Sequence, residues 1–434
     1  MDSRRDFIRK LAVLAGPLPF LAMSNPRLAL ALDRKVKALG SDPAEAASAE
    51  DFWAWIRQSY TVSPDVINLN SGGVSPQPKV VQEAHFFNDQ LSNQGPSYYM
   101  WQIVDKGREP LRAKLATLAG CDPETLAINR NSTEGLNTVI FGLNLKAGDE
   151  VVLTKYDYPH MLSAWRQREK RDGIQLRWVD WDFPLENDDA IVKAYADQIT
   201  PRTKVVHVTH VINWVGQIMP ARAIADMAHA KGCEVIVDGA HSFNHFEFAI
   251  PDTGADYFAT SLHKWLGAPF GSGLLYIKRD KVKTIWPLLG DDNPASDNIR
   301  KFENLGTRSN GSEMAIGNAV DFMSAIGIRR KEARLRYLKD YWMAKAVRIP
   351  KVRFQTSALP KYSCGIASFS IDGWNGNEIC DALFETKKTF VTPIQFEKLN
   401  CVRVSPNLFN SKWELDRLVD GIGELAGASP PKRV

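Results

Sequence analysis

A lysine and an acid in the middle of the chain have the types and the setting for cofactor chemistry. Lys264 lies in the run Ser-Leu-His-Lys-Trp, and Asp238 opens an Asp-Gly-Ala-His run shortly before it. Each follows an apolar run typical of a β-strand. An amine forms a covalent link with the aldehyde of pyridoxal phosphate (PLP), and a carboxylate keeps the pyridine nitrogen of that cofactor protonated. We therefore predict that Lys264 and Asp238 hold PLP in an enzyme of amino-acid or amine chemistry.

Other polar residues follow predicted strands in an order that suits the remaining groups of PLP. Ser132 and Thr133 precede an apolar helical pattern, and the free amides of a helix start suit a phosphate. Tyr158 follows a strand and would stack on a pyridine ring. Asn213 follows another strand and would donate to the phenolate oxygen. Taken singly, each has an ordinary alternative, namely a helix cap, a loop aromatic or a turn asparagine, so the prediction depends on the whole series.

The elements that must position these residues alternate between strands and helices. Apolar runs rich in β-branched residues predict strands over residues 151–154, 176–179, 205–211, 235–237, 257–259 and 273–277. Helical patterns lie between several of them, for example over 221–231, and another helix is predicted over 110–120. The alternation predicts an α/β fold whose mainly parallel sheet is covered on both faces. Ligands of such sheets bind at the carboxyl ends of the strands, where Asp238 and His210 lie.

The length of 434 residues predicts more than one domain. We expect an N-terminal segment over 32–75 that packs on the small domain, a large PLP-binding domain over 76–325, and a small α+β domain over 326–434. The small domain is predicted to contain a charged helix over 329–346 and a strand over 365–371. A capping-box pattern from Ser411 to Glu414 opens its last helix.

Residues 1–31 are predicted to be a twin-arginine export signal. Arg4 and Arg5 precede an apolar stretch, Leu11–Met23, that is too short and too broken to span a bilayer as a retained helix. Residues 29–31, Ala-Leu-Ala, offer a cleavage site. A basic N-terminal helix of a cytosolic protein is the alternative. Because the twin-arginine machinery moves folded proteins, we expect a periplasmic enzyme that captures its cofactor before export.

The composition argues against several other classes of protein. Residues 1–31 contain five Lys/Arg and two Asp/Glu, which leaves 49 basic and 48 acidic residues in the remainder. No dense basic run appears, so nucleic acid is not an expected partner. Five cysteines without CxxC spacing argue against a disulfide framework and against a structural zinc site. We predict no metal site.

Taken together, these motifs resemble the class V aminotransferase family of PLP fold type I, from about Asn68 to the C-terminus. The forms Asp-Gly-Ala-His and His-Lys-Trp-Leu-x-Ala-Pro, the latter over 263–269, resemble the isopenicillin N epimerase branch more than the cysteine desulfurase branch. The resemblance implies a large domain with a mainly parallel sheet flanked by helices, a smaller α+β domain, and a homodimer.

The resemblance also implies a role for each matching residue. Lys264 would hold PLP and shuttle protons, and Asp238 would pair with the pyridinium nitrogen. The other cofactor-binding residues that it implies are His241, Ser132, Thr133, Tyr158, Asn213, Ser261, His263 and Thr307. Of these, Thr307 would reach the phosphate of a second subunit, and Tyr158 stands where many relatives carry a stacking histidine. Arg403 and Arg308 would bind the substrate, since a guanidinium forks onto a carboxylate.

The expected reaction takes place at the α-carbon of an amino-acid group, in a small or peptide-like substrate, as an epimerisation or a transamination. One alternative is oxidative decarboxylation of a glutamyl group of the siderophore pyoverdine, because the chain is similar to a periplasmic PLP enzyme that also carries a twin-arginine signal. Another is a PLP-fold protein that only binds, against which Lys264 and Asp238 argue. A desulfurase is disfavoured, because residues 387–393 contain no cysteine and Cys401 lies on a predicted strand.

Overall fold

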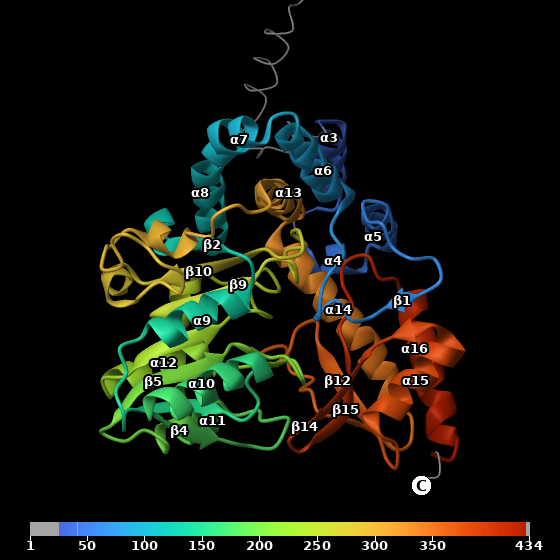
Figure 1. Ribbon diagram of the computed structural model, residues 1–434. Helices are drawn as coiled ribbons and strands as arrows, with labels where there is room; N and C mark the ends of the chain where they lie inside the picture. The colour runs from blue at the N-terminus through green and yellow to red at the C-terminus, as the bar shows by residue number, and fades with distance from the viewer. Residues whose placement is uncertain (1–25, 41, 431–434) are drawn as a thin grey trace, which may run out of the picture.

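The structure, a computed structural model, describes residues 26–40 and 42–430, and Figure 1 shows two sheets with their helices. The predicted export signal lies outside the described residues as far as residue 25. Its last residues, including the expected cleavage site at 29–31, lie in helix α3 (Pro26–Ala38). Within the described ranges, no helix combines the length and the apolarity needed to cross a membrane.

The larger sheet has seven strands and lies within residues 126–277. Their order across the sheet is β2 (Leu126–Asn129), β10 (Gly273–Ile277), β9 (Tyr257–Ser261), β8 (Glu234–Asp238), β5 (Thr203–Thr209), β3 (Glu150–Thr154) and β4 (Gln175–Val179). Strand β10 is antiparallel to both of its neighbours, and all the other pairs are parallel. The predicted mainly parallel sheet is therefore confirmed.

Helices cover both faces of this sheet, which explains why its strands are apolar along nearly their whole length. On one face, α9 (Ser132–Gly142) and α10 (Pro159–Asp172) pack on alternate strand residues such as Val205. On the other face, α8 (Arg108–Ala119), α12 (Ala221–Ala230) and α13 (Asn310–Ile326) pack on the intervening residues such as Val206. The helix predicted over 110–120 is α8, and it ends at Gly120, whose positive φ of 66° suits glycine.

The smaller sheet has four antiparallel strands near the C-terminus. Their order is β11 (Val352–Phe354), β12 (Ala367–Ile371), β15 (Leu399–Val404) and β14 (Thr392–Phe396). Helices α14 (Ile328–Ala346), α15 (Gly376–Lys387) and α16 (Lys412–Gly427) pack on it around a core of their own. The predicted capping box is present, because Ser411 and Glu414 exchange hydrogen bonds at the start of α16.

The N-terminal segment joins the two parts of the molecule. Helix α4 (Pro43–Ser48) packs along α14, and β1 (Ile67–Asn68) pairs with β13 (Thr389–Phe390). Arg57, at the end of α5 (Glu50–Arg57), pairs with Glu414 at 2.9 Å. Leu32 of α3 is fully buried in the large core, beside α13. The chain then passes along the loop of residues 69–78 toward the carboxyl ends of the large sheet.

The remaining elements are helix α6 (Lys79–Asn93), which packs on α13, and shorter segments that connect the others. The shorter segments are α7 (Pro96–Tyr98), η1 (Tyr99–Ile103), η2 (Val104–Gly107), η3 (Pro123–Thr125), α11 (Asp188–Ala196), β6 (Val211–Ile212), β7 (Gln217–Ile218), η4 (Ile250–Thr253), η5 (Arg279–Thr284) and η6 (Ile299–Glu303). The run predicted as one strand over 205–211 is interrupted at His210. There the backbone N–H bonds to Asp238 O, and the chain turns into the β6–β7 hairpin.

Candidate active site

The turns after two neighbouring strands bring the predicted lysine and acid to one edge of the sheet. Strands β8 and β9 are parallel and pair Asp238 with Ala259, so their carboxyl ends lie side by side. Lys264 Nζ lies 2.9 Å from His241 Nε2. Lys264 and Asp238 are close enough for the carboxylate to raise the pKa of the amine. The sequence-predicted residues Lys264, Asp238 and His241 therefore lie together.

Burial governs the charges in this group. Lys264 keeps some exposure to solvent, but desolvation by the surrounding protein lowers the pKa of its amine to about 8. Asp238 is buried, which raises the pKa of its carboxyl. Within the described chain, the carboxylate accepts one hydrogen bond, from Ala240 N at 2.9 Å. Burial holds the pKa of His241 well below its usual range, so the ring is neutral. The buried Asp238 carboxylate, with a single hydrogen bond, suits a cationic group of a ligand.

A second acid lies behind Asp238 and was not singled out in the sequence. Asp157 Oδ1 accepts a 2.6 Å hydrogen bond from Thr209 Oγ1, and Thr209 is paired with Asp238 across β5 and β8. Burial raises the pKa of Asp157 well above its usual value, and the nearby Asp238 raises it further. The signal was present in the sequence, because Asp157 follows the end of β3 as Asp238 ends β8.

The start of helix α9 lies against the end of β9 and is a candidate anion site. Ser132 N donates to Ser261 Oγ at 3.0 Å, and the two hydroxyl oxygens are also 3.0 Å apart. Asn131 caps the helix by accepting from Glu134 N, and Thr133 follows in the first turn. His263 Nδ1 lies 3.2 Å from Ser272 O, and burial lowers the pKa of the ring to about 4. Two hydroxyls and helix-start amides at one point suit a phosphate.

Arg403 lies at the other side of the group on β15. Its Nη1 donates to Asn213 O at 3.0 Å and its Nη2 to Asn70 Oδ1 at 2.9 Å, while the buried Nε has no hydrogen-bond partner within the described chain. Burial lowers the pKa of Arg403 to about 10. No carboxylate of residues 26–40 or 42–430 forms an ion pair with it. Asn213 contributes its carbonyl here, and its side-chain Oδ1 is buried without a hydrogen-bond partner among the described residues.

Tyr158 faces the same space from the start of α10. Burial raises the pKa of its phenol, Asp238 raises it further, and Arg403 opposes the rise, so both charges are close. The side chain is 36% exposed and its ring centroid lies 5.2 Å from that of His160. The position allows contact with a bound ring, and the predicted stacking stays a prediction.

The loop of residues 69–75 closes the site from the N-terminal segment, and its contacts were not predicted. Gly72 N donates to Ser405 Oγ at 2.9 Å. A Cβ at Gly72 would lie 3.0 Å from Ser405 Oγ and 3.7 Å from His241 Cε1, so a side chain there would have to displace Ser405. Asn70, which holds Arg403, lies 333 residues from it in the chain. Neither contact carries a local signal in the sequence.

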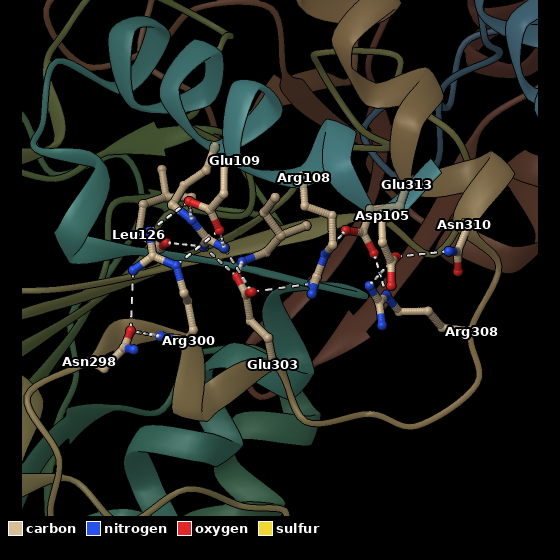
Figure 2. A network of polar contacts seen from close by, with 12 residues as sticks. Asp105, Arg108, Glu109, Leu126, Asn298, Arg300, Glu303, Arg308, Asn310 and Glu313 are labelled. Carbon is tan, nitrogen blue, oxygen red and sulfur yellow. Dashed lines mark hydrogen bonds and ion pairs between the residues drawn. The ribbon is translucent and has the colours of Figure 1, made fainter. Parts of the chain in front are cut away.

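Thr307 and Arg308 form no hydrogen bond or ion pair with Lys264, Asp238 or His241 among the described residues. Thr307 is exposed and lines a cavity of about 450 Å³ together with Arg130 and Phe270. Arg308 donates to Asp105 at 2.9 Å and to Glu313 at 2.8 Å, which occupies its guanidinium (Figure 2). The part that each was predicted to play, Thr307 from a second subunit and Arg308 toward the substrate, stays a prediction.

Buried Glu303 fixes the other end of this loop. It accepts from Arg112 at 2.5 and 2.9 Å and from Ile128 N at 2.6 Å, and it lies 3.2 Å from Arg108 (Figure 2). Residues 304–309 are thus held at both ends by ion pairs. A Cβ built on Gly306, whose φ is 70°, would meet nothing within 4 Å, so the middle of the loop faces open space. The network presents Thr307 outward on a supported loop.

The residues present fit PLP. The cofactor needs an amine, an acid for its ring nitrogen, polar partners for its phenolate oxygen and an anion site for its phosphate. Lys264 and Asp238 supply the first two, and Ser132 and Ser261 flank the candidate anion site. His241 Nδ1 is buried without a hydrogen-bond partner among the described residues, so it is available to a ligand oxygen. Among the described residues, no group of three or more His, Cys, Asp and Glu side chains is placed to bind a metal ion.

Comparison with known sequences gives one family and two kinds of relative. The family model described as aminotransferase class-V matches residues 67–392. Isopenicillin N epimerase of Streptomyces clavuligerus is 28% identical over 395 residues, covering 86% of this chain and 98% of that protein. A probable cysteine desulfurase of Halobacterium salinarum is 30% identical over 416 residues, covering 90% and 98% respectively.

Solved structures share the fold. The apo cysteine desulfurase of Thermococcus onnurineus has a TM-score of 0.77 at 24% identity, covering 87% of this chain and 98% of that one. A C-DES mutant with glycine linked covalently to its PLP cofactor has a TM-score of 0.75 at 21% identity, covering 85% and 99%. The predicted PLP fold type I architecture is confirmed.

Proposed function

Since the chain belongs to the class V aminotransferase family and uses PLP, we propose that it acts at the α-carbon of an amino-acid group as an isopenicillin N epimerase-like enzyme. Epimerisation is the reaction that we favour. Transamination is the alternative reaction at the same α-carbon, and it would use the same residues. The observation that carries the proposal is Arg403, a buried guanidinium without an acidic partner in the described chain, beside Lys264. A buried cation of this kind calls for an anionic ligand, and an amino-acid carboxylate fits it.

The protein's own residues divide the work. Arg403 binds the substrate carboxylate, and Asn70 and Asn213 hold its guanidinium in orientation from two sides. Lys264 Nζ, with a pKa of about 8, gives up and takes back a proton near neutral pH. Asp238 supplies a fixed negative charge for the ring nitrogen. When bound, PLP supplies an electron sink for the charge that develops at the α-carbon.

The cysteines of the chain support a reaction other than sulfur transfer. Residues 387–393, where a mobile cysteine was looked for, form the end of α15, β13 and the start of β14, without a cysteine. Cys401 is fully buried in β15, and burial raises the pKa of its thiol to about 12. Such a thiol is a poor nucleophile because little of it ionises near neutral pH. This favours the epimerase-like relatives over the desulfurases.

Two features complete the proposal. We propose export to the periplasm by the twin-arginine machinery, which the arginine pair and the apolar stretch of residues 1–31 support. We also propose a homodimer, which the loop of residues 304–309 supports, because its exposed Thr307 is flanked by ion pairs on both sides but forms no hydrogen bond with Lys264 among the described residues. In that arrangement each loop completes the phosphate site of the other subunit.

Hydrogen exchange at the α-carbon tests the reaction. PLP-loaded protein incubated with isopenicillin N in D₂O is expected to yield deuterated substrate and its epimer, resolved by mass spectrometry and chiral chromatography. Lys264→Ala is expected to abolish both. Sulfide release from cysteine without exchange would contradict the proposal in favour of a desulfurase. CO₂ release from a peptide-linked glutamate with oxygen uptake, and no exchange, would favour the siderophore-tailoring alternative.

Arg403→Gln is the matching test of the carboxylate site. Truncating one partner of a buried charge pair costs about 2–5 kcal/mol, so KM is expected to rise by roughly 30-fold or more. Arg353→Gln is the control, because Arg353 is exposed and pairs with Asp372 on the surface. Steady-state kinetics that moved KM equally in both variants would exclude Arg403 as the anchor.

A further inference from the structure

The turn that carries His241 continues to a histidine that the reaction itself does not use. His245 is fully buried; its Nδ1 lies 2.8 Å from His241 O, and its Nε2 lies 2.8 Å from Gly365 N. The carbonyl can only accept and the amide can only donate, so the proton of the ring is on Nδ1 and Nε2 accepts. Burial lowers the pKa of His245 to about 3, which keeps this neutral form. Both ring nitrogens are therefore committed.

The ring of His245 also contacts the residue next to the reactive lysine. It stacks on Trp265 with centroids 3.8 Å apart and planes 7° from parallel. Trp265 is fully buried and follows Lys264 directly. One imidazole therefore touches both sides of the contact between Lys264 Nζ and His241 Nε2: the backbone of His241 and the neighbour of Lys264.

A lysine from helix α14 ties the same two turns together from behind. Lys331 is fully buried, and its Nζ donates to Trp265 O and, at 2.7 Å, to Asn244 Oδ1. Asn244 precedes His245, so the turn after Asp238 and the turn after β9 are joined twice. Lys331 and His245 both connect the two turns, but of these two residues only His245 forms a hydrogen bond with His241.

The partner of His245 Nε2 belongs to the small sheet. Gly365 lies just before β12, and β12 pairs with β15, where Ser368 is opposite Arg403. A Cβ at Gly365 would lie 2.9 Å from His245 Nε2, so the amide reaches the ring only because the residue is glycine. This contact also explains why the predicted strand over 365–371 starts at Ala367. His245 thus connects the sheet that carries Arg403 with the turn that carries His241.

We propose that His245 is a positioning residue that sets His241 Nε2 against the nitrogen of Lys264 and couples that contact to the place of β12. This role rests on Lys264 being the lysine that holds PLP, but not on which bond of the substrate is broken. A displaced His241 removes a hydrogen-bond acceptor from the lysine nitrogen, which disfavours the protonated form of that nitrogen. The midpoint of the titration of the Lys264 nitrogen then moves toward lower pH.

Two amide variants separate the two ends of the imidazole. His245→Gln keeps an acceptor for Gly365 N but loses the donor to His241 O, whereas His245→Asn keeps the donor near Nδ1 and loses the acceptor. The measurement is the pH titration of the visible absorption band of PLP-loaded protein. We expect the midpoint of His245→Gln to fall by about 0.5–1 pH unit, as the loss of one hydrogen bond implies, and that of His245→Asn to fall less.

His207→Gln is the matched control. His207 is also fully buried and packs edge-on against Trp165, but it contacts neither turn of the site. It reports the cost of replacing a core histidine, and its midpoint is expected to equal that of the wild type. Gly365→Ala removes no polar group and is expected to shift the midpoint in the same direction by displacing the ring.

The outcomes are distinguishable. A wild-type midpoint in His245→Gln or in Gly365→Ala would overturn the role of His245. Loss of PLP from both His245 variants and Gly365→Ala, with His207→Gln intact, would indicate a role in folding of the site only and would also overturn it. A Lys264→Ala protein that kept the visible band after dialysis would instead refute the cofactor lysine itself, whatever the midpoints.

Discussion

At the scale of single residues, the site is a set of ionisable groups that folding has buried without matching them to one another. Burying a charge that lacks a partner is costly, so such groups persist where a ligand supplies the missing interaction. The Asp238 carboxylate accepts one hydrogen bond within the described chain, from a backbone N–H, and the Arg403 guanidinium has two neutral acceptors. The family's cofactor and an amino-acid carboxylate would supply opposite charges to these two groups.

The lowered pKa of Lys264 predicts how the apoprotein captures PLP. The neutral amine is the nucleophile, and burial lowers its pKa from 10.5 to about 8. With that value about a tenth of the amine is neutral at pH 7, against well under a thousandth for an unperturbed lysine. The rate of PLP capture, followed by visible absorption after mixing, should therefore rise with pH to a plateau above about 8. A rate that kept rising to pH 10, as in a lysine peptide measured alongside, would contradict this environment.

The same residues show what a sequence can reveal about a site. Lys264, Asp238 and His241 were predictable because their types are chemically distinctive and each follows a recognisable strand. Asn70 was not, because its function comes from one contact with Arg403 across most of the chain. His245 was not either, since a buried histidine next to aromatic residues has no distinctive pattern.

At the scale of elements, the apolar runs predicted six of the seven strands of the large sheet and its mainly parallel arrangement, but neither β2 nor the reversed direction of β10. The run at 273–277 matches β10 residue for residue. Strand β10 nevertheless runs antiparallel to both of its neighbours, β2 and β9. Apolar content reports burial on two faces, which is the same for either direction. A predicted strand boundary was wrong where a side chain bonds the backbone in place of a neighbouring strand. At Gly365 the backbone N–H donates to His245 Nε2, and β12 starts at Ala367.

The loop of residues 304–309 gives an element-scale prediction. Glu303 is buried and accepts from Arg112 and from the edge of β2, so Glu303→Gln leaves Arg112 without its main carboxylate. We expect a loss of about 3–5 kcal/mol in the free energy of unfolding, as for other broken buried pairs, and faster release of PLP on dialysis. Denaturant titration and absorption measure the two effects.

Glu109→Gln is the control for that variant. Glu109 pairs with Arg112 and Arg300 but is 54% exposed, so its loss should cost about 0–1 kcal/mol and leave PLP bound. Equal losses in the two variants would mean that the network holds the surface together rather than the loop.

At the scale of the whole molecule, the site draws on every part of the chain described. Asn70 comes from the N-terminal segment, Lys264 and Asp238 from the large sheet, and Arg403 from the small one. Chain segments so far apart in sequence meet only when the molecule has folded, so PLP cannot be held by an unfolded chain. We therefore expect an enzyme exported by the twin-arginine route, which moves folded proteins, to capture PLP before it crosses the membrane.

This requirement makes the twin-arginine signal testable. Arg4→Lys combined with Arg5→Lys is expected to leave the full-length protein in the cytosol, yellow and loaded with PLP, because the site residues described above lie between Asn70 and Arg403. Arg9→Lys, which keeps the arginine pair, should export normally. Fractionation with immunoblotting locates the protein, and the visible absorption of the cytosolic fraction shows whether it is loaded. An unchanged periplasmic fraction in the double variant would refute the route, and a colourless cytosolic precursor would refute loading before export.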